Sequence, residues 1–133
     1  MIAEQMLIQQ EVKEVKAVSQ TDCLFCKIVN GEIPSEVVYQ DDQLLAIKDI
    51  DPVAPIHLLL MPKIHLDSLN DIGPEHLELI GRLQLLAAQL AARLGIAEQG
   101  FRLVNNCGSW GGQAIFHLHY HLLGGKEMGW PPE

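Results

Sequence analysis

Short apolar runs, bounded by turn-forming residues, recur along most of the chain. They predict five strands, at 37–40, 44–48, 57–61, 101–105 and 114–123. One longer segment carries leucine, isoleucine and alanine at helical spacing, which predicts a helix over 74–94 that Gly95 ends. A short helix is expected over 23–30, and a weakly amphipathic pattern over 3–18 predicts a peripheral helical arm.

Together these elements predict an α+β fold. We expect a five-stranded, mainly antiparallel meander with the long helix packed on one face, and a short helix in addition. No internal repeat or long linker divides the sequence, so one domain is expected over 21–133, with residues 1–20 as an N-terminal arm. The apolar arc of the long helix is broad enough to cover the sheet and also to meet a second subunit.

Composition and charge exclude several classes of protein. The chain has 133 residues, of which 48% are hydrophobic, with 9 basic and 17 acidic side chains and a net charge of −8. This acidic balance disfavours binding to nucleic acid or to an anionic membrane, since both require basic patches. No apolar run reaches the roughly 18 residues that span a bilayer. The N-terminus lacks the features of a signal or transit peptide, so a cytoplasmic protein is expected.

Three histidines near the end of the chain alternate with apolar residues. Positions 117, 119 and 121 are spaced as residues that share one face of a strand. On a straight strand the outer two would lie about 13 Å apart, so a single metal ion could bind all three only if the strand were sharply bent. Imidazole titrates near neutrality and suits acid–base or nucleophilic catalysis. The glycine-rich loop at 108–113 precedes them, and its backbone N–H groups can approach phosphate oxygens closely.

The segment 117–123 resembles the His-x-His-x-His-x-x signature of the histidine-triad (HIT) family. Segments 49–57, 62–65 and 111–113 and the tail Trp-Pro-Pro at 130–132 are similar to its Hint branch, the purine nucleoside phosphoramidases. The resemblance runs from about residue 22 to residue 132. It implies a HIT-like fold whose sheet extends across a homodimer, and hydrolysis of substrates such as adenosine 5′-phosphoramidate.

The same resemblance implies a role for each catalytic residue. His119 would be the nucleophile that forms a nucleotidyl-histidine intermediate, and the carbonyl of His117 would hold its other ring nitrogen. His121 and His57 would lie on the proton-relay side. Asp49 would bond the ribose hydroxyls, although an Asp at this turn is also typical of a backbone cap.

Further nucleotide contacts are implied by the resemblance. Four apolar residues match the purine slot, although their spacing equally suits a core: Phe25, Ile28, Ile47 and Ile50. Asn106, Gly112 and Gln113 match the phosphate loop, and Trp130 the C-terminal part of the site. Ala114 stands where the family usually has serine, so a hydroxyl near the phosphate is missing and the catalytic rate is in question.

A Cys-x-x-Cys motif supplies half of a possible zinc site. Cys23 and Cys26 are two of the four ligands that structural zinc requires. In related bacterial triad proteins the set is completed by histidines that match His65 and His117, which implies a structural zinc ion. The alternative is a reduced thiol pair with no metal; a thioredoxin-like role is disfavoured because no strand precedes the motif.

Three rivals to a phosphoramidase remain. A non-catalytic purine-nucleotide-binding scaffold would bind nucleotides without releasing an amine. A dinucleoside polyphosphate hydrolase of a sister branch is disfavoured by the Trp-Pro-Pro tail, and a hydrolase with the triad as metal ligands by the strand geometry.

Overall fold

A computed structural model describes residues 22–132. Contacts within the chain group it into two compact units, 1–34 and 35–133. The described part of the first unit holds the helix α3 (Leu24–Val29), which confirms the expected short helix. Its N-cap is Cys23, whose Sγ accepts a hydrogen bond from the backbone N–H of Cys26 at 3.3 Å. The predicted arm at 1–20 lies outside the described residues.

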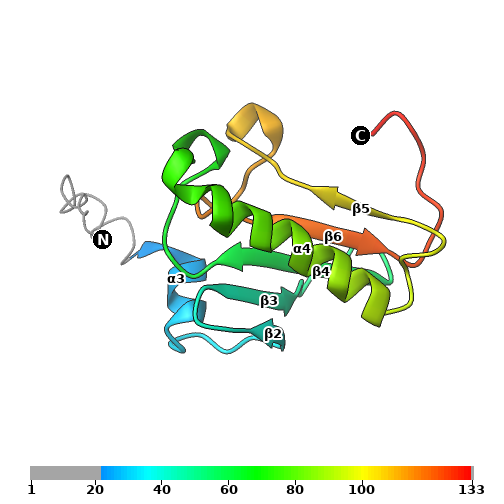
Figure 1. Cartoon of the computed structure of the whole chain (residues 1–133), viewed down its shortest axis with the longest axis horizontal. Helices are drawn as coiled ribbons and strands as arrows, with labels where there is room; N and C mark the ends of the chain where they lie inside the picture. Colours follow the sequence, from blue (N-terminus) through cyan, green and yellow to red (C-terminus); the bar gives the residue numbers. More distant parts are fainter. Residues whose placement is uncertain (1–21, 133) are drawn as a thin grey trace. The chain divides into compact units, whose positions relative to one another are not determined.

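The second unit is built on a five-stranded antiparallel sheet, as predicted (Figure 1). Its strands are β2 (Val37–Gln40), β3 (Leu44–Lys48), β4 (Ile56–Pro62), β5 (Phe101–Val104) and β6 (Tyr120–Gly124). Their order is β2-β3-β4-β6-β5, so the expected meander is wrong after β4, whose next neighbour is β6 instead of β5. β6 lies between β4 and β5 because its alternate residues are buried, which suits a central strand, whereas β5 is half-buried, which suits an edge.

The last strand is shorter than the apolar pattern predicts. It begins at Tyr120, so His117 and His119 precede it and only His121 lies within it. The physical reason is that the backbone of residues 117–119 bonds to a loop and to a side chain, and not to a neighbouring strand. The Leu118 N–H donates to the Leu66 carbonyl at 2.7 Å, and Asn105 Nδ2 donates to the His119 carbonyl at 2.9 Å. The expectation that the three histidines share one face of a strand is therefore wrong.

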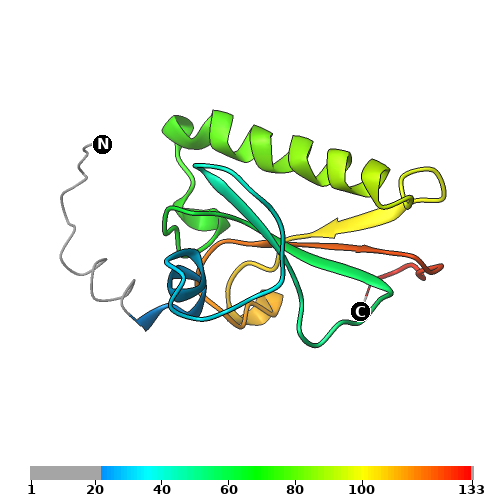
Figure 2. The same ribbon diagram turned by 90° about the horizontal axis from the view of Figure 1, so that it is seen from below.

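The long helix α4 (Leu77–Arg93) covers one face of the sheet (Figures 1 and 2). A 3₁₀ turn, η2 (Pro74–His76), precedes it, and within it the His76 ring accepts the Gly73 N–H at 2.9 Å. Gly95, with φ of +78°, follows the helix as expected. The core between helix and sheet contains Leu44, Ala46, Leu58, Leu60, Leu83, Leu86, Ala87, Leu90, Tyr120 and Leu122.

The turn between β2 and β3 is fixed to the helix by one carboxylate. Asp41 accepts hydrogen bonds from the N–H groups of Gln43 and Leu44, both at 2.8 Å, and from the Tyr39 hydroxyl at 2.7 Å. Arg82 on α4 pairs with it at 3.2 Å. Partial burial acts to raise the pKa of Asp41, but these hydrogen bonds and Arg82 outweigh it and lower the pKa to about 2.

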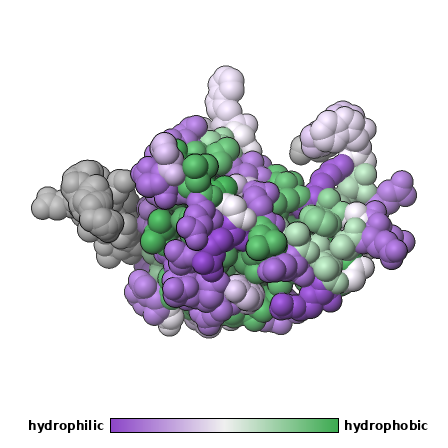
Figure 3. Space-filling model, viewed as in Figure 1, coloured by the Kyte–Doolittle hydropathy of each residue, from purple (hydrophilic) through white to green (hydrophobic). Residues whose placement is uncertain are grey.

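Part of α4 faces outward. Figure 3 shows apolar patches among hydrophilic side chains on the face of the molecule that carries this helix, whose exposed leucines include Leu77 and Leu85. Across residues 22–132, no helix has both the length and the apolar character required to cross a membrane.

Candidate active site

The candidate site lies on the side of the sheet away from α4. In Figure 2 the loop that follows β3 and the loop that carries the 3₁₀ turn η3 (Ser109–Gly111) both lie on that side. His57 on β4 and His121 on β6 are diagonal neighbours, since the register pairs His57 with Leu123 and Leu59 with His121. Their rings meet, with His57 Nε2 2.9 Å from His121 Nδ1.

The proton positions on His57 and His121 follow from their partners. The Val53 N–H donates to His57 Nδ1 at 3.1 Å, so Nδ1 holds a lone pair and the proton of the neutral ring is on Nε2. That proton faces His121 Nδ1 at 2.9 Å and Asp49 Oδ2 at 3.2 Å. Because its Nδ1 accepts, neutral His121 carries its own proton on Nε2, across the ring from His57.

Asp49 uses both carboxylate oxygens. Its Oδ1 accepts the Asp51 N–H at 2.8 Å, and its Oδ2 contacts His57. The backbone-cap interpretation is therefore confirmed, and the same side chain also belongs to the histidine cluster. Binding of a ribose by Asp49 stays a prediction.

His119 is buried, and its ring is held in one tautomer. Its Nδ1 lies 2.7 Å from the His117 carbonyl oxygen. A carbonyl oxygen can only accept, so Nδ1 carries the proton and Nε2 carries the lone pair. This is the protonation state that a nucleophilic Nε2 requires. The His119 and His121 rings are neighbours, with centroids 5.2 Å apart.

Burial keeps the triad neutral. Desolvation lowers the pKa of His117 to about 4. Desolvation, with the nearby His119 and His57, lowers the pKa of His121 to about 4 against the opposing effect of Asp49. Burial also lowers the pKa of His119. At neutral pH all three rings are therefore uncharged, and the His119 lone pair is available for attack.

The glycine-rich loop has a fixed shape. Gly108 and Gly112 have φ of +77° and +88°, which side chains with a Cβ rarely adopt. Buried Gln113 holds the loop, because its Oε1 accepts the Gly108 N–H at 2.9 Å and its Nε2 donates to the Asp67 carbonyl at 2.7 Å. Asn106 Nδ2 donates to the Gly111 carbonyl at 2.8 Å. Gln113 thus acts on the loop itself; its contact with a nucleotide, and that of Asn106 and Gly112, remain predictions.

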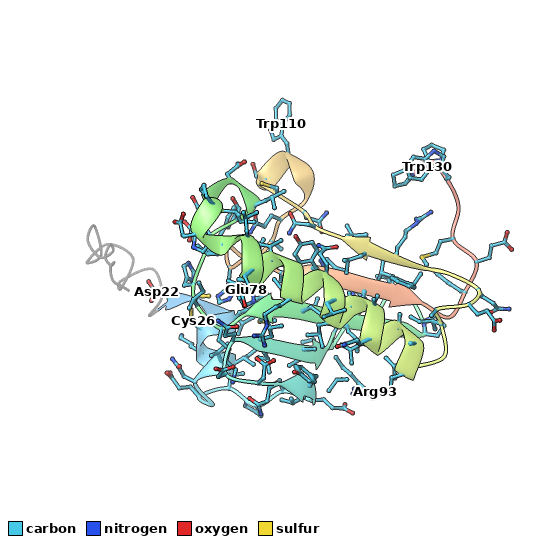
Figure 4. The ribbon with its side chains drawn as sticks, in the orientation of Figure 1. Asp22, Cys26, Glu78, Arg93, Trp110 and Trp130 are labelled. Carbon is cyan, nitrogen blue, oxygen red and sulfur yellow. The ribbon has the colours of Figure 1, made fainter. Side chains whose placement is uncertain are left out.

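The expected purine-slot residues differ in burial. Phe25 is buried and Ile28 half-buried in the first unit, and Ile47 is buried in β3 of the second. Ile50 is 99% exposed, which excludes the core interpretation for this residue. Trp130 is 82% exposed and projects outward, as Figure 4 shows. Ala114 is also exposed.

The predicted zinc ligands are two thiols in the first unit and two imidazoles in the second. None of the three cysteines, all in the described part of the chain, forms a disulfide. Burial, with a hydrogen bond to Cys23, raises the pKa of the Cys26 thiol to about 12, so ionising the Cys26 thiol without a nearby cation is costly. Thiol and imidazole are both ligand types that structural zinc takes.

The two imidazoles are oriented as metal-binding histidines commonly are. His117 Nε2 donates to the Pro62 carbonyl at 2.8 Å, and His65 Nε2 donates to Asp67 Oδ1 at 2.6 Å. Each ring therefore keeps its lone pair on Nδ1, and the outer hydrogen bond fixes that tautomer. The rings are edge-to-face, with centroids 5.0 Å apart. The donor types and tautomers fit zinc.

The residues that hold the histidines in place were not predicted from the sequence. Asn105 Nδ2 bonds the His119 carbonyl, and Asn105 Oδ1 is buried with no partner among the described residues. A polar residue at the end of an apolar strand was the only signal. The contacts of His117 with Pro62 and of Gln113 with Asp67 join residues far apart in the sequence and leave no trace in the pattern, and the local contact of Val53 with His57 leaves none either.

Comparisons with known proteins agree with this geometry. The model of the HIT domain family matches residues 30–128. The purine nucleoside phosphoramidase of Escherichia coli (strain K12) is 46% identical over 108 residues, which cover 81% of this chain and 91% of that protein. A 14 kDa zinc-binding protein of Brassica juncea is 46% identical over 113 residues, covering 84% of this chain and 99% of that protein.

A solved structure gives the same result. The crystal structure of a HIT family hydrolase from Legionella pneumophila Philadelphia 1 superposes with a TM-score of 0.82 at 50% identity, covering 84% of this chain and 99% of that chain. The chain therefore belongs to the HIT domain family. Its similarity to the E. coli protein places it on the Hint branch of that family, as the motifs predicted.

Proposed function

We propose that this chain is a hydrolase of purine nucleoside phosphoramidates that acts through a nucleotidyl intermediate on His119. The observation that carries the proposal is the 2.7 Å bond between His119 Nδ1 and the His117 carbonyl, which leaves the Nε2 lone pair for attack on phosphorus. The E. coli relative is a purine nucleoside phosphoramidase, which supports the substrate class.

The reaction has two balanced steps. In the first, His119 Nε2 bonds to phosphorus, the P–N bond breaks, and the departing nitrogen takes up one proton. In the second, water displaces His119 from phosphorus and releases one proton, so each cycle converts one substrate and one water into the nucleotide and the amine. The His57–His121 pair is the group suited to pass this proton, because its rings already share one at 2.9 Å.

The remaining residues act on the substrate's position and charge. The N–H groups of residues 108, 111, 112 and 113 donate within the loop, so the phosphorus oxygens would draw on those of Ser109 and Trp110 or would replace these internal bonds as negative charge develops. Asp49 would bond the ribose hydroxyls, which requires its Oδ2 to exchange His57 for the ligand. The purine would lie against Phe25, Ile28, Ile47 and Ile50.

The test is an assay on adenosine 5′-phosphoramidate with wild-type and His119→Ala proteins. We expect a covalent adduct on His119 alone, mapped at alkaline pH because acid destroys phosphohistidine. His119→Ala should bind AMP and lose turnover by about three orders of magnitude or more. Binding without amine release by the wild type would favour the scaffold alternative. Label on His117 or His121 would reject the assigned nucleophile.

We further propose that Cys23, Cys26, His65 and His117 hold one structural zinc ion. When bound, zinc would keep both thiols ionised and would tie them to the two imidazoles. Cys26→Ser should lose about one zinc per chain and should lower thermal stability more than AMP affinity. The same zinc content in wild type and Cys26→Ser, measured by elemental analysis after repletion, would reject this site.

We also propose a homodimer, as the Hint resemblance implies. Exposed leucines on α4 and the edge position of β5 supply apolar surface and unpaired strand backbone for a second copy. Sedimentation equilibrium tests it: Leu85→Lys should weaken association, and a monomeric wild type would reject it.

A further inference from the structure

A short chain of hydrogen bonds joins one imidazole to the glycine-rich loop. His65 Nε2 donates to Asp67 Oδ1 at 2.6 Å, and the Asp67 carbonyl accepts Gln113 Nε2 at 2.7 Å. Gln113 Oε1 in turn accepts the Gly108 N–H at 2.9 Å. All four residues lie in the second unit. We call His65, Asp67 and Gln113 the loop anchor.

The side chain of Gln113 is fully committed to this chain of bonds. Gln113 is buried, and its two amide hydrogens go to the carbonyls of Asp67 and Ile115, at 2.7 and 3.0 Å. Only one orientation of the amide satisfies both carbonyls together with the Gly108 N–H, so the positions of its oxygen and nitrogen are fixed. Since both amide hydrogens are used, Gln113 acts on phosphate binding through the shape of the loop and not by contact.

The shape of the loop depends on Gly108, where the loop anchor ends. The Gly108 carbonyl accepts the N–H groups of Gly111 and Gln113, at 3.1 and 3.0 Å. Its own N–H is held by Gln113, and its φ of +77° is one that a residue with a Cβ rarely adopts. A shift of Gly108 would therefore alter the whole turn that the proposed function gives to the phosphate.

The other end of the loop anchor should respond to what the His65 ring binds. The side chain of His65 is 4% exposed and that of Asp67 is 58% exposed, so water competes with the imidazole for this carboxylate. A metal ion on His65 Nδ1 would make Nε2–H a stronger donor, and the outer carboxylate of a metal-bound histidine usually orients its ring. Metal binding should therefore hold Asp67, and with it the carbonyl that accepts from Gln113, more firmly.

We propose that the loop anchor couples metal binding by the His65 and His117 imidazoles to the affinity of the glycine-rich loop for a phosphate group. The coupling rests on two parts of the proposed function, the phosphate site and the zinc ion. Zinc should strengthen AMP binding, and AMP should strengthen zinc binding by the same factor, because coupling free energies are reciprocal. We expect a factor of about five or more. Adenosine has no phosphate, so its affinity should not depend on zinc.

Calorimetry on the full-length protein measures the coupling. AMP and adenosine are titrated into zinc-loaded protein, dialysed free of unbound zinc and checked by elemental analysis, and into protein stripped with a chelator. Asp67→Ala removes the carboxylate at His65 but keeps the backbone carbonyl for Gln113, so its loaded and stripped forms should bind AMP equally. Asp71→Ala is the matched control, because it removes an exposed carboxylate outside the loop anchor, and it should keep the wild-type difference.

The zinc-loaded proteins provide a second measurement that needs no stripped sample. Hydrogen exchange of the Gly108 N–H, followed by NMR, should be slowest in wild type and Asp71→Ala and faster in Asp67→Ala. Gln113→Met keeps the length of the side chain but cannot accept this N–H. It should exchange fastest and weaken AMP binding by about tenfold while adenosine affinity stays unchanged.

Each outcome assigns the failure to one idea. Equal AMP affinity in loaded and stripped wild type, an equal effect of zinc on adenosine, or a retained difference in Asp67→Ala would overturn the coupling. If the stripped protein unfolds, unchanged Gly108 exchange in loaded Asp67→Ala would overturn it instead. A coupled wild type that releases no amine from adenosine 5′-phosphoramidate would reject the proposed activity alone. A wild type that takes up no zinc would reject the coupling together with the proposed ion.

Discussion

Asn105 provides a sharp test of how His119, the proposed nucleophile, is held, because the two polar atoms of the Asn105 side chain have opposite effects on stability. Its Nδ2 donates to the His119 carbonyl at 2.9 Å, while its Oδ1 is buried without a partner among residues 22–132. Losing a buried partner costs about 1–3 kcal/mol, and removing an unpaired buried oxygen returns a similar amount. Asn105→Val removes both atoms, so its free energy of unfolding should lie within about 1 kcal/mol of wild type.

Asn105→Asp should behave differently although it keeps the side-chain size. It retains the unpaired oxygen, replaces the donor by a second oxygen that faces the His119 carbonyl, and adds a partly buried charge. We expect a loss of about 3 kcal/mol, measured by urea unfolding at pH 7. In both variants the His119 carbonyl is no longer fixed, so single-turnover formation of the proposed His119 adduct should slow by about tenfold or more at unchanged AMP affinity. If Asn105→Asp proves as stable as Asn105→Val, the assigned bond is wrong.

Three further outcomes are expected. Asp49→Asn should weaken nucleoside monophosphate binding by about 1–3 kcal/mol and leave inorganic phosphate binding unchanged, with Asp51→Asn as control. Equal losses for both ligands would show that Asp49 acts on folding or on the phosphate, and not on the ribose. Ala114→Ser should raise turnover by restoring the family's hydroxyl, and an unchanged rate would show that the departure is harmless. The pKa of Asp41 is lower in the folded protein than in the unfolded chain, so ionised Asp41 should add about 1–2 kcal/mol to the free energy of unfolding. This contribution should be complete above pH about 4 and lost as the pH falls toward 2. The pH dependence of urea unfolding for wild type, Asp41→Asn and the exposed control Asp42→Asn measures it, and a pH-independent difference would contradict the assignment.

The elements that depend on local pattern were predictable from the sequence. The helical spacing over 74–94 gave α4, with only its first turn tightened to a 3₁₀ turn. The five apolar runs gave five strands. The order of the strands was not predictable in this way. Whether β5 or β6 lies beside β4 depends on which of the two strands buries more apolar surface in the folded protein.

The candidate site shows the same division. The alternation at 117–121 and its resemblance to the triad signature identified these histidines as candidate site residues. The alternation also predicted that all three lie on a strand, whereas the strand begins only at Tyr120. The tautomers of His57 and His119 are set by the Val53 N–H and the His117 carbonyl, and these contacts exist only once the chain has folded. Asp49 shows that two interpretations of one residue can both hold, since one oxygen caps the turn and the other joins the cluster.

The central position of β6 has a consequence for synthesis on the ribosome. The strand that joins β4 to β5 is the last of the five to be made, so until residue 124 has emerged these two strands lack the neighbour between them. The sheet therefore cannot assemble strand by strand in the order of translation, and its long-range pairing must wait for the nearly finished chain. The histidine cluster is completed at that same moment, because His121 arrives with β6. A nascent chain that stalls between residues 113 and 121 therefore carries the whole glycine-rich loop but lacks His121.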